Sequence, residues 1–258
     1  MNVREVMATK IITVSKDRNL RDVLHLMEQH NITKIPVVED GNLVGIVTDG
    51  HIADKLGREH NRSIQLTTMH ASSVMEKDFV VAHPDEDLNV LLEDVGKPGL
   101  TMIPVVQGTK LVGVVTKADL LRLVESSAQV QSFMQKELKS VGPGERLIHA
   151  RRLLLDNDIA RLPVLENGRV KGIIAEHEIA GAFADLKTAD AHVQRVNIRD
   201  MQVDSFMRRK VITGHPEMSA KEAAQKMLKE HVGALPIVAA NGVIQGIVTR
   251  TDLIKTFT

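Results

Sequence analysis

The stretch that decides the fold is Leu235-Pro236-Ile237-Val238, followed by Gly246-Ile247-Val248-Thr249, whose glycine lies ten residues after the proline. An apolar run, a turn-forming segment and a second apolar run indicate two antiparallel strands joined in a hairpin. The same pattern occurs three more times, with the glycine nine residues after the proline. These copies begin at Ile35-Pro36, Ile103-Pro104 and Leu162-Pro163.

Each repeat extends well beyond its hairpin. A β-branched run such as Ile11-Ile12-Thr13-Val14 predicts a strand, and the helical spacing of Leu20, Val23 and Met27 predicts an amphipathic helix. A further helix follows the glycine-led strand, so each unit is predicted to be β-α-β-β-α in an α/β (α+β) fold. A methionine lies 29 residues before each of the four prolines: Met7, Met75, Met134 and Met207.

Composition narrows the class of protein. The chain has 258 residues, of which 43% are hydrophobic and 26% charged, as in soluble globular proteins. It lacks an apolar run long enough to span a membrane and a secretory signal, so we expect a cytoplasmic protein. Zero cysteines exclude disulfides, a cysteine nucleophile and cysteine-ligated zinc. With five Phe and no Trp or Tyr, aliphatic side chains would have to hold any bound base.

The repeat resembles the CBS domain, named after cystathionine β-synthase. The shared pattern is a leading methionine, a β-branched strand, a helix, an apolar-Pro-apolar strand, a glycine-led strand and a closing helix. The resemblance implies pseudo-twofold pairs, or Bateman modules, arranged as one disk-like particle, similar in layout to the γ subunit of AMP-activated protein kinase. We expect repeats at residues 1–57, 70–127, 128–186 and 202–258, in modules 1–127 and 128–258 that meet near Glu125–Gln129.

The resemblance also implies a function. It suggests a stand-alone regulatory sensor of adenosine-containing ligands, namely AMP, ADP, ATP, S-adenosylmethionine or related molecules, with no required cofactor. The repeats take up the chain, and it has no phosphate-binding glycine loop or nucleophile motif, so we expect no enzyme activity. The histidines show no metal-binding spacing, so we expect no metal. The expected partners are the ligand and a regulated protein or second copy, without a membrane.

The family's ligand signature is Thr-x-x-Asp after the glycine-led strand, in which Asp accepts hydrogen bonds from the ribose hydroxyls. Repeats 2 and 4 keep it, whereas repeat 1 has Thr48 with His51 and repeat 3 has Ala175 with Glu178. Thr and Asp are equally suited to capping a helix, so capping and ligand binding both remain open. The intact copies, each with a cation after the threonine, are Thr116, Lys117 and Asp119, and Thr249, Arg250 and Asp252.

A second basic position lies two residues before the core proline. It holds Lys34 in repeat 1 and Arg161 in repeat 3, but Met102 and Ala234 in repeats 2 and 4. We predict composite clefts in which Lys34 joins Thr116 and Asp119, and Arg161 joins Thr249 and Asp252. The alternative is that both cations are solvated strand ends.

The resemblance places the adenine against the first strands, Phe79–Ala82 and Val211–Gly214, with a plain core role as the alternative. The residues assigned there are Val81, Thr213, Pro104 and Pro236, together with Met102.

A nucleic-acid-binding or transcriptional regulator is the second hypothesis. Lys and Arg together equal Asp and Glu at 33 each, but residues 128–258 carry a net charge of +4 and residues 1–127 carry −4. Overall neutrality and the shortage of aromatic residues weigh against this hypothesis. The basic residues in question, which could also form a solvated cluster, are Arg195, Arg199, Arg208, Arg209 and Lys210.

Overall fold

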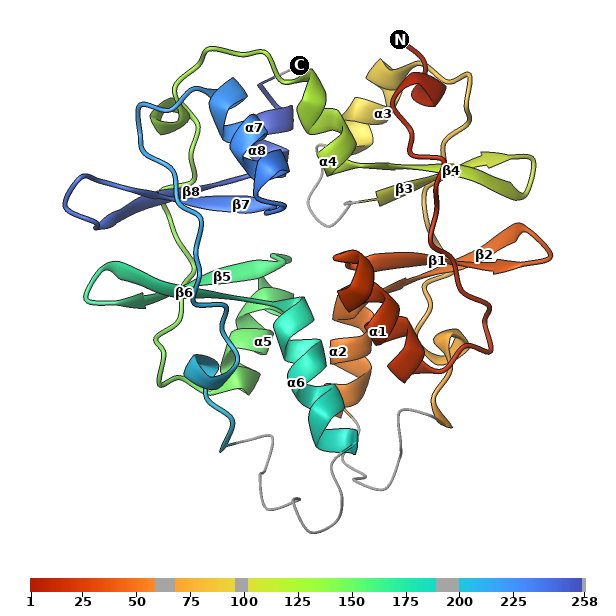
Figure 1. The fold of residues 1–258 in the computed structure, drawn as a ribbon, viewed down its shortest axis with the longest axis horizontal. Coiled ribbons are helices and arrows are strands. Elements are labelled where there is room, and N and C mark those ends of the chain that lie inside the picture. Colours follow the sequence, from red (N-terminus) through yellow and green to blue (C-terminus); the bar gives the residue numbers. More distant parts are fainter. Residues whose placement is uncertain (59–67, 96–101, 189–199, 257–258) are drawn as a thin grey trace.

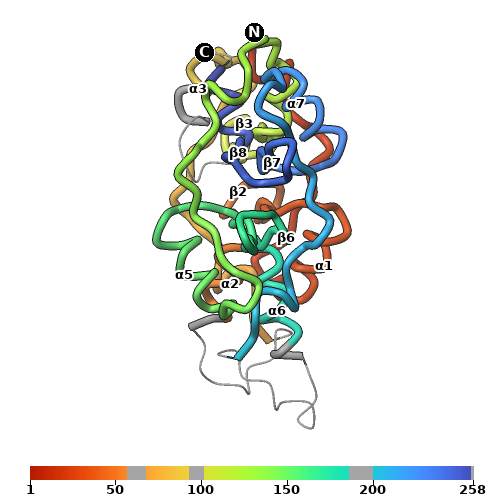
Figure 2. Tube along the Cα trace, turned by 90° about the vertical axis from the view of Figure 1, so that its left-hand side faces the viewer, coloured from red at the N-terminus to blue at the C-terminus, as the bar shows by residue number. Residues whose placement is uncertain are grey.

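A computed structural model of the chain describes residues 1–58, 68–95, 102–188 and 200–256. It contains four similar units, which follow the four sequence repeats and are numbered 1 to 4 in chain order (Figure 1). Repeats 1 and 2 lie on one side of the molecule and repeats 3 and 4 on the other. A view turned by 90° shows the narrow side of the particle (Figure 2). The predicted mixed fold of paired repeats in one flat particle is confirmed.

Each repeat contains one antiparallel hairpin. In the first, Ile35 lies opposite Val47, and a bulge follows between Val37 and Val38. Its turn holds Asp40 and Gly41 at φ 51° and 79°, a left-handed conformation that glycine adopts without strain. The strands are β1 (Lys34–Glu39) and β2 (Asn42–Thr48), β3 (Met102–Gln107) and β4 (Lys110–Thr116), β5 (Arg161–Glu166) and β6 (Arg169–Ala175), and β7 (Ala234–Val238) and β8 (Ile244–Thr249).

The predicted first strand of each repeat is shorter than expected. Val14 pairs with Val37 in a single parallel bridge, in which its N–H donates to Pro36 O at 3.1 Å and its C=O accepts from Val38 N at 2.9 Å. The next parallel bridge toward the N-terminus would need an N–H on Pro36, which proline lacks. The other predicted runs, Phe79–Ala82 and Val211–Gly214, likewise pair only at Ala82 and Gly214.

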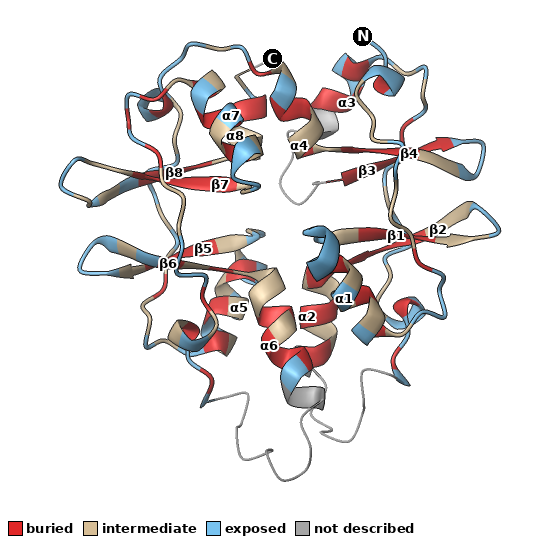
Figure 3. Cartoon of the chain, in the orientation of Figure 1, coloured by how far each residue is buried: buried red, intermediate tan, exposed pale blue. Residues whose placement is uncertain are grey.

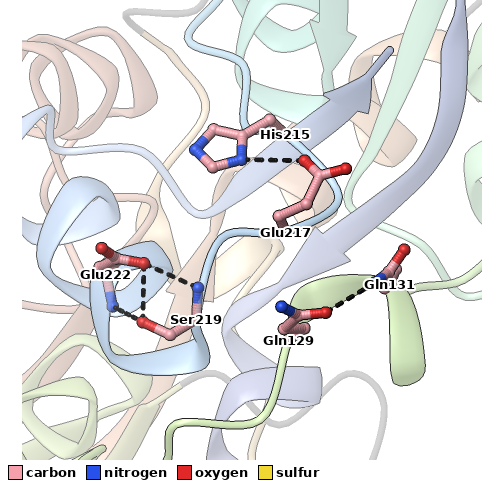
Figure 4. Close-up of polar contacts among 6 residues, drawn as sticks. All are labelled: Gln129, Gln131, His215, Glu217, Ser219 and Glu222. Atoms are coloured by element: carbon pink, nitrogen blue, oxygen red, sulfur yellow. Dashed lines mark hydrogen bonds and ion pairs between the residues drawn. The ribbon is translucent and has the colours of Figure 1, made fainter.

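The helices begin where the sequence offers caps. Asn19 accepts a hydrogen bond from Asp22 N at 2.9 Å, and Ser219 and Glu222 form a capping box (Figure 4). The helices are α1 (Leu20–His30), α2 (Asp49–Arg58), α3 (Leu88–Val95), α4 (Lys117–Leu120), α5 (Leu147–Asp156), α6 (Glu176–Thr188), α7 (Ala220–Lys229) and α8 (Arg250–Ile254). Short 3-10 turns span Val3–Glu5, Ala71–Ser73, Leu121–Leu123, Val130–Ser132 and Val203–Ser205.

The leading segment of each repeat crosses to the hairpin of its partner. Ala8 of repeat 1 pairs with Val114 of repeat 2, and its N–H donates to Val114 O at 2.8 Å. The exchange is reciprocal within both modules, which ties repeat 1 to repeat 2 and repeat 3 to repeat 4. The other crossing pairs are Glu76 with Ile46, Gln135 with Ile247 and Arg208 with Ile173.

This exchange explains two recurring sequence positions at once. Each leading methionine packs on the glycine that opens the partner's apolar run. A Cβ placed on Gly113 would lie 2.5 Å from Met7 Sδ, and one on Gly172 would lie 2.5 Å from Met207 Sδ. Only glycine leaves room for this contact without a shift of the neighbouring atoms. The remaining pairs are Gly45 with Met75 and Gly246 with Met134.

The apolar cores join the two modules. One large cluster combines residues of repeats 1 and 3, such as Leu20 and Phe183, and the other combines repeats 2 and 4, such as Leu120 and Leu253. Buried residues gather along the contacting helices and in the hairpins (Figure 3). Across the module boundary α2 packs against α6, and α4 packs against α8. Burial of apolar surface therefore holds the four repeats in one body.

The connection between the modules is an extended segment rather than a helix. Within Glu125–Gln129, Ser126 O accepts from Lys221 N at 3.1 Å and Ala128 O accepts from Ala220 N at 2.9 Å. These bonds satisfy two N–H groups at the start of α7, which a helix leaves without internal partners.

Candidate functional site

Four strand-to-helix junctions carry the signature positions. We number them by repeat as junction 1 (48–51), junction 2 (116–119), junction 3 (175–178) and junction 4 (249–252). At junction 2, Asp119 Oδ2 accepts from Thr116 N at 2.9 Å and from Thr116 Oγ1 at 2.6 Å. The pair is a capping box at the start of α4, so the helix-cap interpretation is correct. Capping uses one carboxylate oxygen, Oδ2.

Junction 4 has the same box with an added contact. Asp252 Oδ2 accepts from Thr249 N at 2.8 Å and from Thr249 Oγ1 at 2.6 Å. The side chain of Gln135, in the leading segment of repeat 3, donates from Nε2 to Asp252 Oδ1 at 3.0 Å and to Oδ2 at 3.2 Å. Both oxygens of this carboxylate therefore have protein donors.

Junctions 1 and 3 replace the aspartate and pair its substitute with a charged group. Glu178 Oε2 accepts from Ala175 N at 3.1 Å, while its Oε1 accepts from Arg208 Nη2 at 3.0 Å. At junction 1, His51 Nε2 lies 3.9 Å from Glu76 Oε2. Burial lowers the pKa of the His51 imidazole, which favours the neutral ring in this contact.

At junctions 1, 3 and 4, the side chain that faces the signature residue comes from the same position of the repeat. Glu76, Gln135 and Arg208 each follow a leading methionine directly and belong to the partner repeat. The residue at this position opposite junction 2 is Ala8, which offers no side-chain donor. Among the residues that the structure describes, none donates to Asp119 Oδ1.

Buried charges lie beside the junctions, where the modules meet. The first helix residue is acidic in repeats 1 and 3 and basic in repeats 2 and 4. Lys117 and Asp49 are only 5% and 4% exposed, respectively. Together with the two strand-start cations, these residues form a group that we call the inter-module charged cluster: Lys34, Asp49, Lys117, Arg161, Glu176 and Arg250.

Burial is the largest cause of the pKa shifts of Asp49, Lys117 and Arg250. Burial, reinforced by the Glu176 carboxylate, raises the pKa of Asp49 to about 7. Burial and the positive charge of Lys34 lower the pKa of Lys117 to about 8. Burial and the charge of Arg161 lower the pKa of Arg250 to about 10. An oppositely charged partner would stabilise the ionised form of each group.

The cations after the threonines reach across the module boundary. Lys117 Nζ lies 2.7 Å from Thr251 Oγ1 of junction 4, and the Asp252 charge partly offsets the lowering of its pKa. Arg250 Nη2 donates to Val232 O at 3.3 Å, and its buried Nε has no hydrogen-bond partner among the described residues. The Asp119 charge partly offsets the lowering of the Arg250 pKa. Each cation is therefore affected by the charge of the other module's aspartate.

The strand-start cations also converge on this region. Lys34 and Arg161 are half-buried, and their charges act on Lys117 and Arg250, respectively. The Arg161 guanidinium lies against Gly233, where a Cβ would be 2.6 Å from Nη1. They are therefore not simply solvated strand ends, although the composite clefts themselves remain a prediction.

The residues expected around adenine differ in burial. Val81 and Thr213 are half-buried and directly precede the bridging residues Ala82 and Gly214. Pro104 and Pro236 are buried within β3 and β7. Met102 is 7% exposed and packs with Ile46 and Val114 in a small apolar cluster between the hairpins of repeats 1 and 2.

Sequence reasoning missed the carboxylates of the charged cluster and the side chains facing the junctions. Asp49 and Glu176 occupy the same register position as Lys117 and Arg250, so aligning the repeats already shows the alternation of charge. Gln135 and Arg208 are also in register, but their relevance depends on knowing that leading segments are exchanged.

Two features of the described part of the chain bear on other functions. Residues 1–58, 68–95, 102–188 and 200–256 contain no group of three or more His, Cys, Asp or Glu side chains placed to hold a metal. Within the same residues, no helix has the length and apolar character needed to cross a membrane.

Comparison with known proteins agrees with the four-repeat organisation of the chain. The CBS domain family model matches residues 3–58, 71–126, 130–185 and 202–258. Protein MJ1225 of Methanocaldococcus jannaschii is 28% identical over 271 residues, covering 96% of this chain and 95% of its own. Its crystal structure, described as that of a proposed archaeal homologue of g-AMPK, superposes with a TM-score of 0.87 over both whole chains. An uncharacterized conserved protein of Pyrococcus horikoshii shares the fold at 23% identity, with a TM-score of 0.64 and full coverage of both chains.

Proposed function

The chain belongs to the CBS domain family of regulatory modules, and we propose that it senses a phosphate-bearing adenosine ligand at junctions 2 and 4. The observation that carries the proposal is that two intact Thr-x-x-Asp junctions lie beside four buried or half-buried cations, Lys34, Lys117, Arg161 and Arg250. Such a site suits a ligand with vicinal hydroxyls and negative charge.

The aspartates supply the hydroxyl recognition. A carboxylate accepts hydrogen bonds strongly from adjacent hydroxyls, because its charge assists each bond. The capping box holds Asp119 by Oδ2 and leaves Oδ1 without a donor among the described residues. The carboxylate is therefore oriented before the ligand arrives, which reduces the entropy lost on binding.

The inter-module charged cluster supplies the phosphate recognition. It combines four cations, Lys34, Lys117, Arg161 and Arg250, with two carboxylates, Asp49 and Glu176. The described part of the chain provides no hydrogen bond to the Arg161 guanidinium. A phosphate would give these cations a further anionic partner, which favours AMP, ADP or ATP over S-adenosylmethionine, whose sulfonium is positive.

Adenine recognition rests on the aliphatic edges of the first strands. Val81 and Thr213 are half-buried beside the bridging residues, so the proposed base lies against apolar side chains and backbone groups. This assignment agrees with the absence of Trp and Tyr.

The ligand would act as a signal because the junctions begin the helices that join the modules. Junctions 2 and 4 open α4 and α8, which contact each other across the boundary. A ligand that prefers one helix arrangement shifts the population toward it, and a protein partner or second copy can read the change.

Nucleic-acid binding gains no support from the basic residues that suggested it. Arg208 pairs with Glu178, and Arg209 pairs with Asp204 at 2.9 Å. Arg195 and Arg199 lie outside the described residues. The overall net charge of the chain is zero, which provides no general attraction to nucleic acid.

Substitution of the two aspartates tests the proposal. We expect Asp119→Ala and Asp252→Ala each to weaken AMP binding at its junction roughly tenfold to a hundredfold, as loss of a charge-assisted hydrogen bond typically does. Calorimetric titration with AMP, adenosine and S-adenosylmethionine measures this change and the preference for phosphate. In thermal unfolding, AMP at 100 times its dissociation constant should stabilise the wild-type protein by about 2.7 kcal/mol.

A matched variant separates binding from helix capping. Glu222→Ala removes the same kind of capping box from α7, away from the junctions, and should lower the melting temperature without changing AMP affinity. If the two aspartate variants resemble Glu222→Ala, losing stability but keeping full AMP affinity, the aspartates are caps alone and the proposal is wrong.

A further inference from the structure

We infer that the residue after each leading methionine sets the ligand affinity of the partner repeat's junction. This inference rests on the proposed function and deepens it. The four repeats provide four versions of one geometry, in which a leading segment pairs with the second strand of its partner two residues before the junction begins. The facing residues are Ala8 for junction 2, Gln135 for junction 4, Arg208 for junction 3 and Glu76 for junction 1.

The clearest contrast is between the two intact junctions. Gln135 donates its amide to both oxygens of Asp252, at 3.0 and 3.2 Å. Those are the contacts that ribose hydroxyls would make, so the ligand must first displace the amide. Ala8 occupies the corresponding place opposite Asp119 and brings no donor. Junction 2 is therefore the tighter site, and junction 4 the weaker one.

At junctions 1 and 3, which lack the signature aspartate, the residue after the partner's leading methionine is charged. Arg208 donates to Glu178 at 3.0 Å, and the Glu178 side chain is only 14% exposed. Glu76 faces His51, with 3.9 Å between Oε2 and Nε2. At junction 3 the facing arginine therefore occupies the carboxylate that replaces aspartate, whereas at junction 1 Glu76 only lies near a neutral His51. Of the four signature positions, only Asp119 keeps a carboxylate oxygen without a donor among the described residues.

A graded pair of sites has a functional consequence. Junctions 2 and 4 open the two helices that meet across the module boundary, and Lys117 Nζ of junction 2 lies 2.7 Å from Thr251 Oγ1 of junction 4. One protein can then respond to two ranges of ligand concentration, with junction 2 filled first.

Exchanging the facing residues tests the inference. AMP is the probe, and single-junction proteins report one site at a time by calorimetry. In the Asp119→Ala background, where only junction 4 keeps its aspartate, Gln135→Ala should tighten AMP binding roughly threefold to tenfold, the effect of removing one competing hydrogen bond. In the Asp252→Ala background, Ala8→Gln should weaken binding at junction 2 by a similar factor.

Gln131→Ala is the matched control. It removes a glutamine from the same leading segment, whose amide contacts Gln129 at 2.7 Å rather than a junction (Figure 4), and should leave AMP affinity unchanged. Unfolding curves check that every variant is folded. If Ala8→Gln does not fold, the AMP affinity of Gln135→Ala alone tests the inference. If Gln135→Ala and Ala8→Gln both change the AMP affinity less than twofold, the inference is wrong, but the proposed function is unaffected. Failure of the unmodified protein to bind AMP would overturn the proposed function, and the inference with it.

Discussion

In the proposed site, a single carboxylate serves folding and ligand binding with different atoms. Asp119 caps α4 through Oδ2 and has no donor to Oδ1 among the described residues, so helix capping orients the oxygen proposed to bind the ligand. The two interpretations of Thr-x-x-Asp are therefore compatible, because a carboxylate has two oxygens and several acceptor positions.

The Asp49 carboxylate has a different role, since its environment opposes its charge. It is 4% exposed, accepts from Gly50 N at 2.9 Å, and faces Glu176, Lys34 and Arg161. Its pKa is about 7 in the folded protein against a usual 3.8, so the folded state binds the proton more tightly than the unfolded state. Its contribution to stability is therefore present below pH 4 and is lost as pH rises toward 7.

We predict that Asp49→Asn raises the free energy of unfolding relative to wild type at pH 8. The amide keeps an acceptor for Gly50 and removes a buried charge. Between pH 4 and 7 the difference between the two proteins should grow with pH by up to about 1.4 kcal/mol per unit. Urea unfolding across this range measures it. A constant difference between variant and wild type would show that Asp49 does not titrate in this window.

Among the elements, the exchanged leading segment does the most to define a module. Its backbone pairs with the partner's second strand, and its methionine fills the space above the partner's glycine. A pair of repeats therefore shares contacts that neither repeat can make alone.

We predict that Gly113→Ala lowers the free energy of unfolding by about 1–3 kcal/mol, as overpacking typically does. The new Cβ would lie 2.5 Å from Met7 Sδ and 3.3 Å from Ala8 O. Gly144→Ala is the control, because a Cβ there meets nothing within 4 Å. Chemical denaturation compares the two. Equal stability of both variants would mean that the methionine moves aside without cost.

Local elements were predictable from the sequence, and exchanged ones were not. The hairpins depend on neighbouring residues, and the structure confirms them. The caps at Asn19 and Ser219 are equally local. The first strand was overestimated, because Pro36 removes the N–H that would extend its pairing. The Gln135–Asp252 contact joins residues 117 positions apart, so only the pairing of repeats brings it about.

At the scale of the whole molecule, two kinds of contact run in perpendicular directions. Hairpins and leading segments join repeat 1 to repeat 2 and repeat 3 to repeat 4, whereas the large apolar clusters join repeat 1 to repeat 3 and repeat 2 to repeat 4. The Arg151–Asp54 ion pair, with 2.5 Å between Nη2 and Oδ1, also links α5 to α2 across the boundary.

We propose that the aspartate of an intact junction binds the ribose of an adenosine ligand while its neighbours bind phosphate. A crystal structure of the protein grown with AMP would show whether it does. We predict nucleotide density at junction 2, with a ribose hydroxyl within hydrogen-bond distance of Asp119 and the phosphate directed at the inter-module charged cluster. AMP bound instead at junction 1 or 3, or with its ribose away from both Asp119 and Asp252, would contradict the account.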